Sequence, residues 1–130
     1  MPFWIIPDKI GTMAEDEQAD PGVNIVDVRD LVDGTNAPEV IIPKILLGEI
    51  MLLNNLPFMV RCKMGVSRSN AIAAGILTYH TPTSTFEDNL GLVKDKVPRA
   101  LPNMEIIDSV KKALEMMRGT EKIVAIKKEY

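Results

Sequence analysis

The segment VRCKMGVSRSN, from Val60 to Asn70, contains the only cysteine of the chain, Cys62. Gly65 follows three positions later and Arg68 six positions later. A loop of this composition between a strand and a helix can curl so that successive backbone N–H groups point inward and bind an anion. The spacing therefore predicts a site for a tetrahedral oxyanion such as phosphate.

The same loop would also activate a nucleophile. A helix N-terminus and a neighbouring arginine favour the thiolate form of a cysteine, and the thiolate is the reactive species. Arg68 can hold two phosphate oxygens with its planar guanidinium, and Gly65 permits a backbone conformation that a side chain disfavours. We therefore expect Cys62 to attack phosphorus in line and to form a thiophosphate intermediate.

The composition is that of a soluble globular protein. The chain has 130 residues, 46% hydrophobic and 25% charged, which predicts one domain over residues 1–130. A net charge of -3 disfavours general nucleic-acid binding, and one cysteine with one histidine disfavours a structural metal site. We expect no cofactor. The N-terminus lacks signal-peptide features and no apolar run reaches the ~20 residues of a membrane span, so we expect a cytoplasmic protein without a membrane partner.

Apolar runs in the first half of the chain predict strands at residues 4–6, 23–28 and 58–60, the last leading into Cys62. The acidic segment 12–22 predicts a loop. A helix is expected within residues 38–54, with Pro43 in its first turn and five apolar residues on its inner face. These five are Ile42, Ile45, Leu46, Ile50 and Leu53.

Three helices are expected after the cysteine loop. Residues 69–80 are small and apolar all round, which is typical of a buried helix. The next helix would open with the capping box of Ser84 and Glu87 and end before Pro98, with an inner face of Phe86, Leu90 and Val93.

The last main helix would be capped by Asn103 and end at Gly119. Its expected buried stripe consists of Ile107, Val110, Leu114 and Met117. For residues 122–130, a strand and further helix both remain open. The order of elements predicts an α/β fold with a small, mostly parallel central sheet flanked by helices, and a ligand site at the carboxyl ends of the strands.

The segment VRCKMGVSRS resembles the signature of the Cys-based dual-specificity protein phosphatases, a compact form of the protein tyrosine phosphatase superfamily. That signature usually reads V-H-C-x-x-G-x-S-R-S, and every fixed position matches except the one before the cysteine, where Arg61 replaces His. IIPDKIGT at residues 5–12 and KVPRALPN at residues 96–103 resemble the start of that fold and the segment before its closing helix. The resemblance covers most of the chain and implies a protein tyrosine phosphatase-like fold.

The resemblance also implies a role for each matching residue. Cys62 would be the nucleophile, Arg68 the phosphate clamp, and Ser69 a hydrogen-bond donor that eases departure of the sulfur. Asn103 would support the loop. The substrate phosphate would be bound by the backbone amides of the loop, which belong to Lys63, Met64, Gly65, Val66, Ser67 and Arg68.

A general acid must protonate the leaving oxygen, and the family places an aspartate for this on a loop upstream of the cysteine. The segment VDVRDLVDG offers three candidates. Asp27 lies within the apolar strand pattern. Asp30 falls just after the strand and is the preferred candidate, with Asp33 as the reserve.

These observations predict a cysteine-dependent phosphatase whose partners are proteins phosphorylated on tyrosine, serine or threonine. Three alternatives use the same loop: removal of phosphate from phosphoinositides, to which Lys63 points, removal of RNA 5'-phosphates, and binding of phosphoproteins without turnover. A rhodanese-type sulfurtransferase fits less well because the Ser-Arg-Ser ending suits a phosphatase. Arg61 would either donate the bonds that the usual histidine makes or disturb the packing of the loop.

Overall fold

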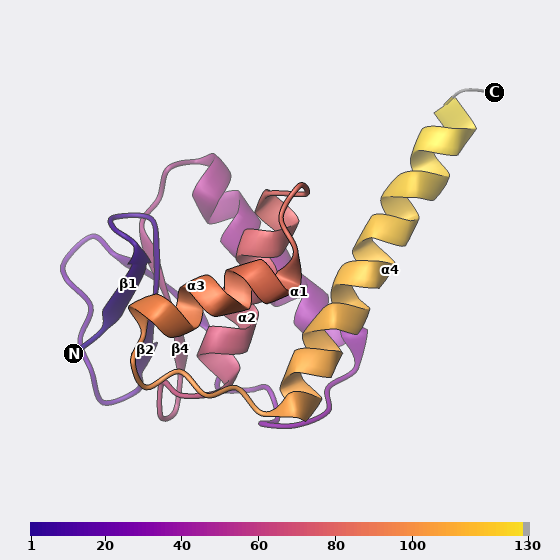
Figure 1. Cartoon of the computed structure of the whole chain (residues 1–130). Coiled ribbons are helices and arrows are strands. Elements are labelled where there is room, and N and C mark those ends of the chain that lie inside the picture. The colour runs from indigo at the N-terminus through magenta and orange to yellow at the C-terminus, as the bar shows by residue number, and fades with distance from the viewer. Residues whose placement is uncertain (129–130) are drawn as a thin grey trace.

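The computed structural model describes the backbone of residues 1–128 and the side chains of residues 1–119. These residues form a small mixed sheet of four strands flanked by four helices (Figure 1). In chain order the elements are β1 (Phe3–Ile6), β2 (Ile10–Ala14), β3 (Asn24–Asp27), α1 (Pro38–Leu53), β4 (Phe58–Cys62), α2 (Arg68–His80), α3 (Phe86–Lys96) and α4 (Met104–Lys128).

The strand order in the sheet is β1-β2-β4-β3. Strand β4 pairs in parallel with both β2 and β3, and only β1 runs antiparallel to its neighbour. The expectation of a mostly parallel sheet is therefore confirmed. Because β4 lies between two parallel neighbours, its last residue, Cys62, emerges at the carboxyl edge beside Ala14 of β2.

Strand β2 corrects one prediction, because residues 12–14 belong to it and not to a loop. It is buried along its whole length. A side chain at Gly11 would place its Cβ 2.4 Å from the carbonyl oxygen of Phe3 and 2.5 Å from the sulfur of Met59. Glycine at this position thus permits the close approach of the Phe3 backbone on β1 and of the Met59 side chain on β4.

Helix α1 lies where it was expected, but two details of the prediction were wrong. The helix begins at Pro38, so Pro43 lies inside it and not in its first turn. The buried residues are Ile41, Ile45 and Gly48, so that only Ile45 of the predicted face is fully buried. Leu46, Ile50 and Leu53 are 40%, 54% and 66% exposed. The helix is apolar on nearly every side, so helical spacing could not identify its inner face.

Helix α2 is the centre of the packing. It contacts β2, β4 and each of the other three helices. Its residues 69–78 are all buried, as the composition predicted. Because α2 starts directly after the cysteine loop, this burial fixes the position of the loop's end.

Helix α3 begins one residue later than predicted. Thr85 caps it by accepting a hydrogen bond from the backbone N–H of Asp88 at 3.1 Å. Ser84 is not the cap, because its hydroxyl donates to the carbonyl oxygen of Thr81 at 2.7 Å. The predicted stop before Pro98 is confirmed.

Helix α4 is capped by Asn103, whose Oδ1 accepts the N–H of Ile106 at 2.8 Å, and its predicted stripe is buried. Gly119 does not end it, since the helix continues to Lys128 and extends away from the other elements in Figure 1. An interior glycine costs a helix only about 1 kcal/mol and need not stop it. Residues 122–128 are therefore helical, and residues 129–130 lie outside the described part. Among the described residues, no helix is long and apolar enough to cross a membrane.

Candidate active site

The loop after β4 wraps around the sulfur of Cys62. The backbone N–H of Gly65 donates to Sγ at 3.2 Å, and Sγ lies 3.2 Å from the hydroxyl oxygen of Ser69. Cys62 is 2% exposed and Ser69 is fully buried. Gly65 has φ +70°, the left-handed conformation expected from its position in the motif. Both hydrogen bonds would persist with a thiolate, which accepts from the amide and from the hydroxyl.

The outer side of the loop is held by hydrogen bonds to its carbonyl groups. Nδ2 of the buried Asn70 donates to the carbonyl oxygens of Gly65 and Val66, each at 2.9 Å. The backbone N–H of Leu101 also donates to Val66, at 2.9 Å. In a trans peptide the N–H points away from its carbonyl, so the N–H groups of Val66 and Ser67 face away from these donors.

Arg99 supports the loop from behind. A Cβ on Gly65 would lie 2.7 Å from Nη2 of Arg99, so only glycine leaves room for this guanidinium. Arg99 pairs with Glu17 through Nη2 at 2.5 Å and Nη1 at 3.2 Å, and it lies over the ring of Phe3. Burial alone would raise the pKa of Glu17, but the bonds from Arg99 and from the backbone of Ala14 outweigh it and lower that pKa to about 2.

A cavity of about 310 Å³ opens above Cys62. We call it the cysteine cavity, and its lining consists of Asp33, Cys62, Met64, Val66, Ser67, Arg68, Leu101 and Asn103. Within the described side chains, Arg68 is the only cation of this lining. Lys63 is exposed and does not line the cavity.

Asn103 connects three segments at the rim of the cysteine cavity. Its backbone N–H donates to Oγ of Ser67 at 3.1 Å. Its Nδ2 donates to Oδ1 of Asp33 at 2.8 Å and to the carbonyl oxygen of Asp33 at 2.9 Å. One residue, through its backbone N–H and its side chain, thus ties the cysteine loop, the segment after β3 and the start of α4 together.

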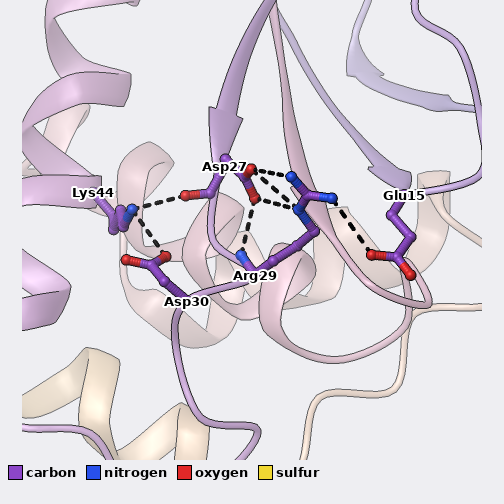
Figure 2. Close-up of a pocket in the computed structure, with 5 residues that line it drawn as sticks. All are labelled: Glu15, Asp27, Arg29, Asp30 and Lys44. Carbon is purple, nitrogen blue, oxygen red and sulfur yellow. Dashed lines mark hydrogen bonds and ion pairs between the residues drawn. The ribbon is translucent and has the colours of Figure 1, made fainter.

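Asp30, the preferred candidate for the general acid, lies elsewhere. It lines a depression of about 530 Å³ with Glu15, Asp27, Arg29 and Lys44, which we call the charged depression (Figure 2). Its carboxylate pairs with Nζ of Lys44 at 3.0 Å, and its side chain is 67% exposed. The structure therefore groups Asp33, and not Asp30, with Cys62 and Arg68.

Several supporting residues were missed by sequence reasoning. Asn70 directly follows the signature, so its position was a usable signal. Arg99 lies in the segment that resembles the family, but its partner Glu17 is 82 positions away in the chain. Arg61, the departure from the signature, hydrogen-bonds Asp27 on β3, and only the register of the sheet reveals this pair.

The similarity of this chain to known proteins is found at the level of the fold. No protein-family model matches the chain, and no curated protein matches it. Among solved structures, a mouse putative dual specificity phosphatase complexed with zinc tungstate is 19% identical, with a TM-score of 0.73 over 92% of this chain and 90% of that one. Human DUSP28 is also 19% identical, with a TM-score of 0.74 over 91% of this chain and 99% of its own.

A leucine rich repeat and phosphatase domain containing protein from Entamoeba histolytica is 15% identical, with a TM-score of 0.74 over 92% of this chain and 94% of that chain. PTPMT1 in complex with PI(5)P is 12% identical and covers 70% of this chain, with a TM-score of 0.61 over 58% of its own length. The first three match the arrangement of sheet and helices over more than nine-tenths of this chain, and PTPMT1 matches part of it. The chain therefore has the fold of the compact dual specificity phosphatases.

Proposed function

We propose that the chain is a cysteine-dependent phosphatase that hydrolyses phosphate monoesters on phosphotyrosine and phosphoserine/threonine proteins. The observation that carries this proposal is the position of Cys62, whose sulfur lies at the base of a cavity also lined by Arg68. A fold shared with phosphatases supports the same reading. Loop amides and the Arg68 guanidinium would hold three phosphate oxygens above the sulfur.

In the first step the thiolate of Cys62 attacks phosphorus, and the bond from phosphorus to the leaving oxygen breaks. The leaving oxygen takes a proton from a carboxylic acid, which becomes a carboxylate. In the second step that carboxylate accepts a proton from water, whose oxygen attacks phosphorus while the bond to sulfur breaks. Phosphate leaves, and the hydroxyl of Ser69 stabilises the departing thiolate by the 3.2 Å contact described above.

We propose Asp33 as the general acid in place of Asp30. Asp33 lines the cysteine cavity, and its Oδ1 is held by Asn103, so Oδ2 can carry the proton. Asp30 is instead paired with Lys44 in the charged depression. A general acid must reach the leaving group within hydrogen-bond distance, and this requirement favours the residue that shares the cavity with the nucleophile.

Protein substrates are preferred over highly charged small ones because of the lining of the cavity. Arg68 is its only cation among the described side chains, while the exposed Met64 and Leu101 give its rim an apolar character. A phosphoinositide or an RNA 5'-end carries several anionic groups and would call for more cations. Lys63, which could have supplied one, does not line the cavity.

The test is hydrolysis of matched phosphotyrosine, phosphoserine and phosphothreonine peptides, alongside a phosphoinositide and a 5'-phosphorylated RNA. The proposal expects turnover of peptides without added metal, abolished by Cys62→Ser. Turnover of the phosphoinositide or RNA alone would assign the substrate to that class. Binding of phosphopeptides with no turnover by the wild-type protein would identify a phosphoprotein-binding protein without catalytic activity.

A further inference from the structure

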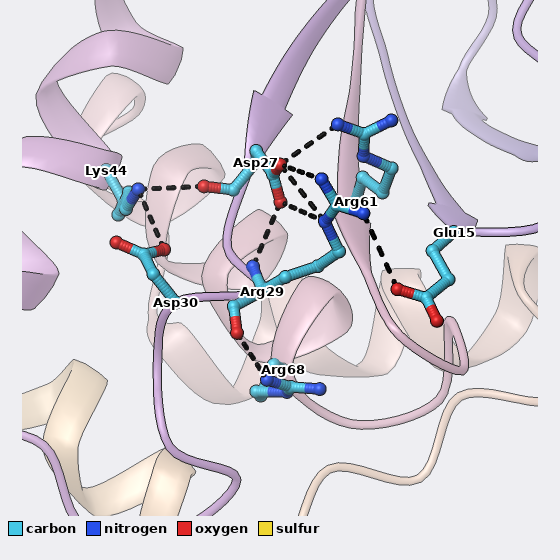
Figure 3. Close-up of polar contacts among 7 residues, drawn as sticks. All are labelled: Glu15, Asp27, Arg29, Asp30, Lys44, Arg61 and Arg68. Atoms are coloured by element: carbon cyan, nitrogen blue, oxygen red, sulfur yellow. Dashed lines mark hydrogen bonds and ion pairs between the residues drawn. The ribbon is translucent and has the colours of Figure 1, made fainter.

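Arg61 occupies the position before Cys62 where the resembled signature has histidine, and it is engaged across the sheet. Arg61 and Asp27 are register partners on β4 and β3. Nη2 of Arg61 donates to Oδ2 of Asp27 at 2.9 Å, and the Arg61 side chain is only 26% exposed (Figure 3). Its charge is therefore compensated by this carboxylate and is not directed at the sulfur.

The same carboxylate fixes the turn that follows β3. The backbone N–H of Arg29 donates to Oδ1 of Asp27 at 3.0 Å. The Arg29 guanidinium binds both oxygens, through Nε to Oδ1 at 3.0 Å and Nη2 to Oδ2 at 2.8 Å. These bonds from Arg29, followed by those from Arg61, hold the pKa of Asp27 far below its usual range, so the carboxylate stays charged at neutral pH.

The turn in its fixed form presents two carbonyl groups to the proposed phosphate clamp. Nη1 of Arg68 donates to the carbonyl oxygen of Arg29 at 2.9 Å and to that of Leu31 at 2.8 Å. Among the described residues, these are the hydrogen bonds that Arg68 makes to protein, and both use Nη1. The opposite edge of the guanidinium remains available to a ligand in the cysteine cavity.

We propose that Arg61 and Asp27 are positioning residues that orient Arg68 for phosphate binding, acting through the turn at Arg29. This inference rests on the proposed function, since it treats Arg68 as the phosphate clamp. The path has three steps: Arg61 holds Asp27, Asp27 holds the backbone N–H of Arg29, and the carbonyl group of Arg29 holds Nη1 of Arg68. Arg61, which stands where the signature has histidine, thus supports Arg68 through Asp27 on the neighbouring strand β3.

The test measures binding of inorganic phosphate by isothermal titration to the Cys62→Ser protein, where no turnover occurs. Adding Asp27→Asn or Arg61→Gln should weaken phosphate binding about tenfold, the effect of one misplaced charged hydrogen bond. Arg61→Lys keeps a cation beside Asp27 and should restore most of the affinity. Thermal melting establishes that each variant is folded.

The matched control is Arg118→Gln. Arg118 also donates to protein, through Nη2 to the carbonyl oxygen of Thr78 at 3.0 Å, but it lines a different groove between α2, α3 and α4. This control should bind phosphate as the parent does. Unchanged affinity in folded Asp27→Asn, or an equal loss in Arg118→Gln, would overturn the positioning role.

Failure of the proposed function gives a different pattern. If phosphate binding depends on Asp27 but the wild-type protein hydrolyses no phosphate ester, the catalytic proposal fails and the positioning inference stands. If the parent binds no phosphate, turnover by the wild-type protein still decides the catalytic proposal, and nitrogen NMR of the arginine side chains decides the positioning inference. Restricted rotation of the Arg68 guanidinium should then be present in the wild type and lost in Asp27→Asn, and identical spectra would refute the inference.

Discussion

Two hollows lie at the carboxyl edge of the same small sheet, and they differ in the number of their charged residues and in how those residues are paired. The charged depression is the larger, about 530 Å³ against about 310 Å³ for the cysteine cavity, and all five of its lining residues are charged. Those charges are engaged with one another: Arg29 with Asp27 and Glu15, and Lys44 with Asp30. The cysteine cavity has only two charged residues in its lining, Asp33 and Arg68, and shares that lining with the buried Cys62.

Neither the volume of a hollow nor its number of charged residues identifies the candidate site by itself. A cation already paired with a carboxylate would have to give up that partner before binding a phosphate, which opposes binding. Arg68 links the two hollows, because it lines the cysteine cavity while Nη1 binds carbonyl groups of the turn beside the charged depression. The turn beside the charged depression therefore contacts a side chain that lines the cysteine cavity.

The largest effect short of removing the nucleophile is expected from Arg68→Lys. Lysine keeps the charge but cannot hold two phosphate oxygens and the turn carbonyls with one planar group. We expect kcat with p-nitrophenyl phosphate to fall about 100- to 1,000-fold, the range found when a transition-state donor is lost. Arg118→Lys, which lies outside both hollows, serves as the control, and a loss of similar size in both variants would contradict a specific role of Arg68.

Asp33 of the cysteine cavity and Asp30 of the charged depression should differ in their effect on kcat. Asp33→Asn should lower kcat on a phosphotyrosine peptide about 100-fold, because the leaving oxygen would depart without a proton. Asp30→Asn removes an exposed ion pair with Lys44 and should change kcat less than about fivefold. The reverse ranking would return the role of general acid to Asp30.

A third comparison concerns stability and involves two glutamates close in sequence. Glu17→Gln should lower the free energy of unfolding by about 2 kcal/mol at pH 7, because its carboxylate holds Arg99 beneath the loop. Glu15→Gln, whose side chain is 40% exposed and lies 3.5 Å from Arg29, should cost less than about 1 kcal/mol. Urea unfolding of both variants measures the difference.

The pH dependence of the Glu17 effect follows from its lowered pKa. The folded state binds the proton of Glu17 only near pH 2, whereas the unfolded state binds it near the usual value of 4.5. The stabilisation is therefore complete above pH 4.5 and is lost as pH falls toward 2. The gap between wild type and Glu17→Gln should narrow over that interval, and a constant gap would contradict the ionic role.

The smallest effect is expected from glycine substitutions. Gly65→Ala forces a side chain into a left-handed conformation and against Arg99, and should cost about 1–2 kcal/mol of stability with a loss of phosphate affinity. Gly91→Ala in α3 meets no atom within 4 Å and should stabilise the helix by up to about 1 kcal/mol. Equal effects of the two changes would show that the loop tolerates a side chain at Gly65.

The sequence allowed much of the fold to be predicted where local chemistry determines it. The composition of residues 69–80 indicated a buried helix, and Asn103 was recognisable as a helix cap. Helix α1 was harder, because Leu46, Ile50 and Leu53 are as apolar as the residues that the fold buries. Gly119 resembled a helix stop, yet α4 continues through it to Lys128.

The residues of the candidate site also divide into those that local sequence indicates and those that only the fold brings together. Cys62, Gly65 and Arg68 lie within one loop, so their spacing along the chain already indicates their proximity. The choice of general acid between Asp30 and Asp33 depends on how the turn after β3 folds. The two residues are three positions apart in the chain and line different hollows. The pairing of Arg61 with Asp27 follows from strand register, which the sequence pattern did not contain.

The central claim is that Cys62 attacks phosphorus, and the most direct measurement is capture of the covalent intermediate. The wild-type protein is mixed with a radiolabelled phosphotyrosine peptide, quenched in acid within milliseconds, digested and analysed by mass spectrometry. We predict labelled phosphate on the peptide that contains Cys62, and none in the Cys62→Ser protein. Turnover of the substrate with no label on Cys62 at any quench time would contradict the claim.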